Sequence, residues 1–171
     1  MKLTGFEAAS IDPAAARELR FAVEEFNAEY CAVLDSGEVE QWPEFFTQDA
    51  IYRITARENA DAGMRVGLVY AEGKGMLQDR AVSIARTQMF APRYNLHVTG
   101  NVRVLALQED GEFSAQSSFM LLQTLVDGPT TLHLAGRYFD RFVREGNSLL
   151  LRERQAVYDT TMIATDLVYP V

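Results

Sequence analysis

The fold is decided by residues 98–159, which read VTGNVRVLALQEDGEFSAQSSFMLLQTLVDGPTTLHLAGRYFDRFVREGNSLLLRERQAVYD. Three polar turn sequences divide this stretch: Glu109-Asp110-Gly111, Asp127-Gly128-Pro129 and Glu145-Gly146-Asn147. Connections this short join antiparallel neighbours, so the stretch predicts a four-stranded meander at 98–108, 113–126, 131–143 and 149–159. Strands of this length must twist and curl in a small domain, and Gly136 is a candidate bend or bulge in the third.

The first half of the chain predicts helices ahead of this sheet. Asp12 and Pro13 form a capping sequence, and apolar residues then recur at helical spacing until Gly37, which predicts one long amphipathic helix. The other elements predicted are a short helix at 39–46, a turn at 47–49, a strand at 50–55, a loop at 57–65, a short strand at 66–70 and a helix at 74–86. Helices followed by a curled antiparallel sheet make an α+β fold whose helices cover the concave side and leave a cone-shaped interior.

The length of 171 residues predicts a single domain over residues 1–171. Residues 1–12 are expected to be a loose N-terminal tail. The segment 162–171 is apolar for a tail, and a free apolar tail would promote aggregation. It is therefore expected to dock on the chain's own core or on a neighbouring subunit.

Charge and composition exclude several classes of function. The formal net charge of −8 repels phosphate backbones and anionic membranes, so neither nucleic acid nor a membrane surface is an expected partner. No apolar run approaches the roughly 20 residues of a membrane helix, and no signal-peptide block is evident. The single cysteine, Cys31, cannot form an internal disulfide and is expected to be a buried, inert thiol. The cytoplasm is the expected compartment.

Four tracts, in this order and spacing, carry a resemblance to a known family. They are Phe26-Asn27-Ala28-Glu29-Tyr30 with Leu34-Asp35, Trp42 and the run from Phe45 to Tyr52; Asp79-Arg80 with the run from His97 to Val104; the run from Gly136 to Phe142; and the run from Leu150 to Asp159. Together they resemble the small, or beta, subunit of Rieske-type aromatic-ring-hydroxylating oxygenases. The nearest branch acts on aromatic carboxylates such as terephthalate, salicylate or anthranilate. The resemblance covers roughly residues 20–165.

The resemblance implies a cone-shaped fold of the nuclear-transport-factor-2-like (cystatin-like) type. It implies a structural, non-catalytic subunit that forms a trimer and seats the large, or alpha, subunits in an alpha3beta3 complex. The large subunit would carry the Rieske [2Fe–2S] cluster and a mononuclear Fe(II), and a separate reductase would supply electrons from NADH. No catalytic, cofactor-binding or metal-binding residue is then expected in this chain.

A count of ligands agrees with that division of labour. A Rieske cluster needs two cysteines and two histidines, and the oxygenase iron needs two histidines and a carboxylate. The chain has one cysteine and two histidines, His97 and His133, so it cannot hold both sites. One position departs from the family pattern: Leu96 stands where many members carry an arginine before the histidine. A salt bridge between subunits at that position is not expected to carry over.

The alternative is a stand-alone dehydratase or isomerase of the same fold. His97 would then be a general base inside the cone, or Asp49 and Asp159 would supply a carboxylate base beside the Tyr52 phenol. The competing interpretation is structural: a hydrogen-bonded His97, an Asp49 that caps a turn, a Tyr52 packed in the sheet and an Asp159 that ends the last strand. His133 lies near a hairpin turn and is expected to be exposed.

Two further groups of residues admit both a binding and a structural interpretation. Trp42, Phe45 and Phe46 are expected in the core rather than in a ligand cage. Five arginines occupy two neighbouring predicted strands, where they alternate with Asp140, Glu145 and Glu153. This alternation favours cross-strand ion pairs on a solvated or interface face, as opposed to a basic patch for an acidic partner. The five are Arg137, Arg141, Arg144, Arg152 and Arg154.

Overall fold

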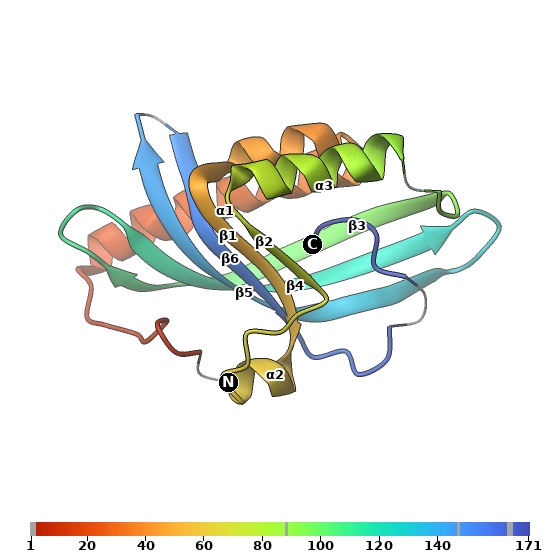
Figure 1. Cartoon of the computed structure of the whole chain (residues 1–171). Coiled ribbons are helices and arrows are strands. Elements are labelled where there is room, and N and C mark those ends of the chain that lie inside the picture. The colour runs from red at the N-terminus through yellow and green to blue at the C-terminus, as the bar shows by residue number, and fades with distance from the viewer. Residues whose placement is uncertain (1–2, 88, 147, 164–165) are drawn as a thin grey trace.

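A computed structural model describes residues 3–87, 89–146, 148–163 and 166–171. Its centre is one strongly curved sheet in which the strands follow the order β2-β1-β6-β5-β4-β3 (Figure 1). The four long strands are β3 (Arg93–Leu107), β4 (Phe113–Leu125), β5 (Thr130–Glu145) and β6 (Ser148–Tyr158). They pair antiparallel in chain order, so the predicted meander is confirmed.

Two further strands extend the sheet beyond β6. β1 (Phe46–Ala56) runs parallel to β6, with Ile51 opposite Glu153, and β2 (Val69–Glu72) pairs antiparallel with β1. The turn predicted at 47–49 is wrong, because these residues belong to β1. The register of β1 against β6 shifts between Phe46 and Ile51, and the polar residues at this irregularity are what suggested a turn.

Three helices cover the concave side of the sheet: α1 (Pro13–Asp35), the 3-10 helix η1 (Val39–Phe45) and α3 (Lys74–Arg86). The short helix α2 (Arg57–Asp61) lies apart from them, and its Ala60 is buried with Phe6 and Phe139 in a second core on the outer face. The cap of α1 is as predicted: an Asp12 side-chain oxygen accepts hydrogen bonds from the backbone N–H of Ala14 and Ala15, both at 3.0 Å. Residues 57–65 were predicted to be a loop, and the structure forms the short helix α2 within them.

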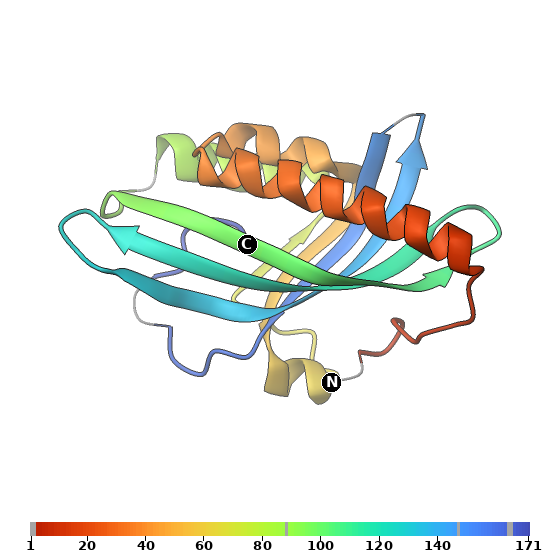
Figure 2. The ribbon, with the colours of Figure 1, turned by 180° about the vertical axis from the view of Figure 1, so that it is seen from behind.

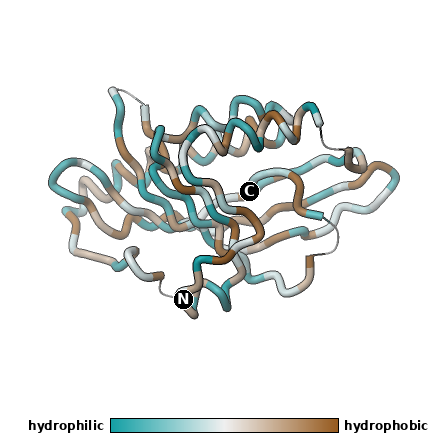
Figure 3. The backbone as a smooth tube through the Cα atoms, viewed as in Figure 1, coloured by the Kyte–Doolittle hydropathy of each residue, from teal (hydrophilic) through white to brown (hydrophobic). Residues whose placement is uncertain are grey.

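The helices and the curved sheet together enclose the predicted cone, so the α+β class is confirmed. Seen from behind, α1 crosses the concave side of the sheet along much of its length (Figure 2). Hydrophobic and hydrophilic residues alternate along the strands (Figure 3), and the residues that point into the cone form the main core. Among the described residues, no helix is long and apolar enough to cross a membrane.

Gly136 is needed for a close approach between β5 and β6. A Cβ atom at this position would lie 2.1 Å from the backbone oxygen of Val157, a separation that real Cβ atoms do not show. The bulge in this part of the sheet lies on the same strand: Leu121 pairs with Leu134 and Leu122 with Leu132, so His133 is the extra residue of β5. Gly136 therefore lets two strands approach, and the bulge lies three residues before it.

The N-terminal segment, expected to be a loose tail, lies against the outer face of the sheet from Leu3 onward. Leu3 and Phe6 are buried in a small second core with Phe139, and the rings of Phe6 and Phe139 meet edge to face at 5.6 Å. The backbone N–H of Ala9 donates to the carbonyl oxygen of Leu105 at 2.7 Å. Burial of apolar side chains against the sheet is what holds this segment in place.

Candidate functional site: the interior of the cone and the charged outer face

The interior of the cone contains a buried ion pair between β5 and β6. Arg154 and Asp140 face each other in the strand register, and their side chains are 0% and 1% exposed. The guanidinium donates from Nε and Nη2 to the two carboxylate oxygens, both at 2.9 Å. Nη2 also donates to Asn27 Oδ1 on α1 at 2.7 Å. The pair thus joins the sheet to the helix that covers it.

Aromatic rings complete the surroundings of the Arg154 guanidinium, whose central carbon lies 4.3 Å from the ring centre of Tyr30 and 4.1 Å from that of Tyr138. Burial acts to lower the pKa of Arg154, but the adjacent Asp140 carboxylate outweighs it, so the pKa lies above its usual value. The arginine therefore keeps its charge inside the core. Arg154 was expected on a solvated or interface face, and that prediction is wrong.

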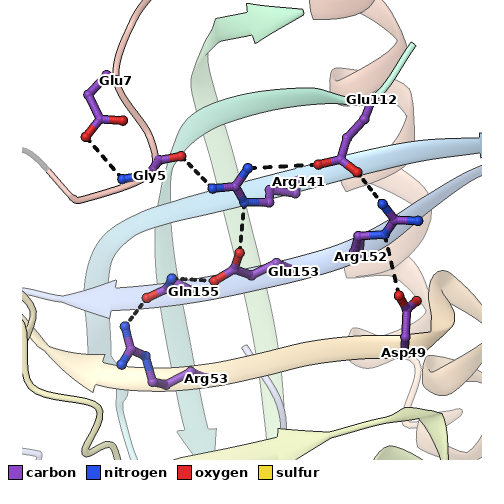
Figure 4. A network of polar contacts seen from close by, with 9 residues as sticks. All are labelled: Gly5, Glu7, Asp49, Arg53, Glu112, Arg141, Arg152, Glu153 and Gln155. Atoms are coloured by element: carbon purple, nitrogen blue, oxygen red, sulfur yellow. Dashed lines mark hydrogen bonds and ion pairs between the residues drawn. The ribbon is translucent and has the colours of Figure 1, made fainter. Parts of the chain in front are cut away.

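The other strand arginines do lie outside. Figure 4 shows Arg141 beside Glu153 and Glu112, and Arg152 between Glu112 and Asp49, on the outer face of β1, β5 and β6. Arg137 pairs with Asp159 at 3.2 Å, and Arg144 is exposed. The predicted ion pairs between β5 and β6 are thus confirmed for Arg141 with Glu153 and, inside the cone, for Arg154 with Asp140, whereas Arg137 and Arg152 pair with acids outside these two strands. The part-exposed pairs of Arg137, Arg141 and Arg152 are each worth at most about 1 kcal/mol.

The C-terminal segment fills the other part of the cone. Val171 is fully buried, and its carbonyl oxygen accepts hydrogen bonds from the phenols of Tyr30 at 3.1 Å and Tyr52 at 3.0 Å. The Val171 N–H donates to the Tyr52 oxygen at 2.9 Å, and Trp42 Nε1 donates to the Tyr30 oxygen at 2.8 Å. Burial raises the pKa of Tyr30 to about 12. These phenols are therefore hydrogen-bonding groups that hold the chain's own backbone.

The acid–base set proposed for a stand-alone enzyme is not assembled. Tyr52 is buried inside the cone, whereas the Asp49 side chain is 69% exposed on the outer face beside Arg152. Asp159 lies at the end of β6, where it pairs with Arg57 at 3.1 Å and with Arg137. Burial raises the pKa of Tyr52 well above its usual value, which disfavours proton release. No two of these three residues share a site.

His97 is a hydrogen-bonded structural histidine, as the structural interpretation of the sequence predicted, and not a free general base. Its Nδ1 lies 2.6 Å from Asp35 Oδ1 at the end of α1, and its backbone N–H donates to the other Asp35 oxygen at 2.9 Å. The contact fastens α1 to β3. Cys31 is buried one helical turn earlier, and burial raises the pKa of its thiol to about 11, as expected for an inert cysteine.

His133 was expected to be exposed, and that prediction is wrong, because it is 1% exposed. It falls at the register shift between β4 and β5, where the alternation of side chains changes phase. Burial and the neighbouring Arg93 lower the pKa of His133.

Trp42 and Phe46 lie in the core as predicted, with ring centres 5.3 Å apart, and Phe45 packs at its edge.

Hollows large enough for a ligand lie on the outer face. One of about 390 Å³ is lined by Phe6, Arg103, Gln116 and Phe139. A second of about 660 Å³ lies between β1, the loop after α2 and the N-terminal segment, and is lined in part by Arg53, Arg65, Tyr70 and Gln155. Among the residues that the structure describes, no three histidine, cysteine or acidic side chains gather as a metal site would need.

Reasoning from the sequence missed Asn27, Asp35 and Asp140 as interior groups. A signal was available for Asp140, because it alternates with Tyr138 and Phe142 on the face of β5 that points inward. A charge on an apolar face needs a partner, and Arg154 is the residue opposite. No comparable signal marks Asp35, since the last turn of a helix is an ordinary place for a solvated carboxylate.

Comparisons with known proteins agree with this arrangement. A family model described as "Ring hydroxylating beta subunit" matches residues 30–165. The small subunit of anthranilate 1,2-dioxygenase from Burkholderia cepacia is 35% identical over 142 residues, which cover 83% of this chain and 88% of that protein. A beta subunit of the terminal oxygenase component of terephthalate 1,2-dioxygenase from Comamonas sp is 34% identical over 146 residues, covering 85% and 94%.

A solved structure shows the same fold at similar identity. It is described as the beta subunit of an aromatic-ring-hydroxylating dioxygenase from Novosphingobium aromaticivorans. The two sequences are 37% identical, and the match covers 91% of this chain and 98% of the solved one. The TM-score between the two structures is 0.82. The cone and its order of strands are therefore features that this chain has in common with a solved relative.

Proposed function

The chain belongs to the family of ring-hydroxylating beta subunits, and we propose that it serves as the structural, non-catalytic subunit of an oxygenase that hydroxylates an aromatic carboxylate. Its task is to associate as a trimer and to seat the large subunits in an alpha3beta3 complex. The aromatic carboxylate is proposed from the names of the anthranilate and terephthalate relatives. All of residues 1–171 are proposed to act as a single domain in this role.

The filled interior of the cone is the observation that carries the non-catalytic role. Arg154, Tyr52 and Trp42 are among the largest fully buried side chains, and Val171 occupies the space between the tyrosines. A dehydratase or isomerase needs a polar, ligand-sized cavity there, with a base in reach of it. Asp35 and His97 contact each other, and Asp140 contacts Arg154, so these groups stabilise the fold. No residue of this chain is proposed to be catalytic.

The redox groups are proposed to belong to the large subunit: a Rieske [2Fe–2S] cluster and a mononuclear Fe(II), supplied with electrons from NADH by a separate reductase. The ligand count supports this assignment, because one cysteine and two histidines cannot hold both centres. The His97 Nδ1 atom contacts Asp35, His133 hydrogen-bonds the Asp166 backbone, and the Nε2 atoms of both histidines are buried. The cytoplasm is the proposed compartment.

Co-purification tests the proposal. The tagged chain is expressed together with the large-subunit gene of the same genome, and the captured material is analysed by mass and by visible spectrum. A larger polypeptide with the absorption of a Rieske cluster is expected to elute with the tag. A tagged Asp140→Asn chain, whose core is perturbed, serves as the control for folding. Absence of any iron–sulfur polypeptide in the wild-type eluate would contradict the proposed function.

A further inference from the structure

The segment 166–171 occupies the interior of the cone without belonging to its framework. Pro170 and Val171 are buried, and the end of the segment, marked C, lies below α3 in Figure 1. The segment forms no helix or strand, and in the described part of the chain none of its backbone groups bonds to another backbone group. It is therefore held as a bound peptide is held, by side chains of the surrounding structure.

Side chains anchor this segment at its outer end and at its middle. At the outer end, the Arg93 guanidinium donates to the two carboxylate oxygens of Asp166 at 3.0 and 3.2 Å, and the Asp166 side chain is 54% exposed. At the middle, Nη2 of Arg80 on α3 donates to the carbonyl oxygen of Val168 at 3.0 Å. The outer anchor can be removed by a change at an exposed side chain, which leaves the framework of the cone intact.

The inner end of the segment lies in a site built to hold an oxygen atom. The phenols of Tyr30 on α1 and Tyr52 on β1 converge on the carbonyl oxygen of Val171, at 3.1 and 3.0 Å. Trp42 donates to the Tyr30 oxygen at 2.8 Å, and a hydroxyl that accepts a hydrogen bond becomes a stronger donor. Burial raises the pKa of both phenols, so they remain protonated donors at neutral pH. Two donors aimed at one oxygen suit a carboxylate as well as a backbone carbonyl.

Arg80 supplies a positive charge to this part of the interior. Within the described residues it forms no ion pair, and its Nε atom is buried without a hydrogen-bond partner. Its charge reaches the Tyr52 phenol, where it offsets part of the rise in pKa that burial causes. Arg154, another cation beside these phenols, is already paired with Asp140. The charge of Arg80 is thus available to an anionic group, although the segment offers it only a neutral carbonyl.

We propose that the segment 166–171 is a displaceable plug, and that the space it vacates binds a small carboxylate with an apolar body, held by the Tyr30 and Tyr52 phenols and by Arg80. The walls suit such a body, because the Trp42 ring packs edge to face on that of Tyr52 at 5.0 Å. Plug and ligand compete for one space, so the apparent affinity for the ligand is the intrinsic affinity reduced by the fraction of chains that are open. This is binding without catalysis, and it does not depend on the large subunit.

Titration of the full chain with benzoate, followed by the fluorescence of Trp42, tests the plug. Trp42 is the single tryptophan of the chain and is fully buried beside the proposed site, so its emission reports on this part of the interior. Asp166→Ala releases the outer anchor and is expected to bind benzoate several-fold more tightly than the wild type, because more chains are open. Asp166→Asn keeps the shape of the side chain and is expected to give an intermediate affinity. Circular dichroism checks that each variant is folded.

Changes at Arg80 test the class of ligand. In the Asp166→Ala background, Arg80→Gln is expected to weaken benzoate binding several-fold, and Arg80→Lys to recover most of it, because the site needs the charge. Benzamide is the neutral counterpart of benzoate, and its affinity is expected to be the same with and without Arg80→Gln. Arg86→Gln makes the matched change on the same helix, at a side chain that is 67% exposed and pairs with Glu40, and is expected to leave the benzoate affinity unchanged.

Each part of the proposal can fail separately. No saturable change of Trp42 emission in either folded Asp166 variant would overturn the site, and equal benzoate affinities in the wild type and both variants would overturn the plug. Equal losses from Arg80→Gln and Arg86→Gln, or an equal loss for benzamide, would overturn the role of the Arg80 charge. The co-purification experiment is independent of these results: if benzoate does not bind but the iron–sulfur polypeptide is captured, the site is wrong and the proposed function stands. If benzoate binds as expected but no such polypeptide is captured, the site stands and the proposed function fails.

Discussion

Removal of the charge of Asp140 is the sharpest test of how the cone is held together. Asp140→Asn keeps the shape of the side chain but leaves the fully buried Arg154 cation without a counter-charge. The variant loses one of the two 2.9 Å hydrogen bonds, because the amide NH2 group cannot accept, and the other then ends on a neutral oxygen; a hydrogen bond to a charged group is worth about 1.5–3 kcal/mol. Breaking a buried ion pair from one side costs about 3–5 kcal/mol. For a chain of this size that corresponds to a fall in Tm of about 6–20 °C.

The assay is urea unfolding of the wild type and of three variants, monitored by circular dichroism. Glu153→Gln makes the same acid-to-amide change on the outer face, beside the part-exposed Arg141, and is expected to cost less than about 1 kcal/mol. A double variant, Asp140→Leu with Arg154→Met, removes both charges and is expected to be more stable than Asp140→Asn alone. A cost below about 1 kcal/mol for Asp140→Asn, or a double variant that is less stable than it, would refute this account of the pair.

Three other changes test separate parts of the structure. Gly136→Ala is expected to destabilise the chain by about 1–3 kcal/mol, because its Cβ would collide with the Val157 backbone oxygen; an unchanged urea midpoint would contradict the close approach. Tyr52→Phe removes the hydroxyl that serves both the carbonyl and the N–H of Val171, so a loss of about 1–3 kcal/mol is expected in thermal melts, and no loss would show that the segment is held otherwise. The pKa of His133 is lowered in the folded protein, so the unfolded chain binds the proton more readily. The part of the folding stability that depends on a neutral His133 is therefore present above 6.5, the ordinary pKa, and is lost as the pH falls through the pKa of the folded state. Unfolding free energies measured across this range are expected to fall less in His133→Gln than in the wild type, and an equal fall would exclude His133 as the cause.

The sequence predicted the parts of the fold that depend on local signals. The three turn sequences between 98 and 159 set the meander, and Asp12 with Pro13 set the start of α1, because turns and caps are determined by a few neighbouring residues. The parallel pairing of β1 with β6 was not predicted. It joins residues far apart in the chain, and no short-range pattern specifies which strand a lone segment will join.

The interior was predicted less well than the outer face. Alternating charges on β5 and β6 correctly indicated cross-strand ion pairs, but the same pattern placed Arg154 outside, since composition alone does not say which face of a strand is inward. His133 was assigned by its distance from a turn, and the bulge between β4 and β5 changed its face. The family resemblance indicated the role of the chain, and the filled cone then explained why the enzymatic alternative lacks a site.

The parallel pairing of β1 with β6 also sets when the protein can fold. Ile51 and Glu153 are neighbours in the sheet but lie about 100 residues apart in the chain, and such non-local contacts slow folding. While the chain is being synthesised, β1 has its partner β2 on one side and an open edge on the other until β6 emerges. An open edge is a template for pairing with other chains. Nascent copies growing side by side are thus most prone to aggregation in the interval between the synthesis of β1 and of β6.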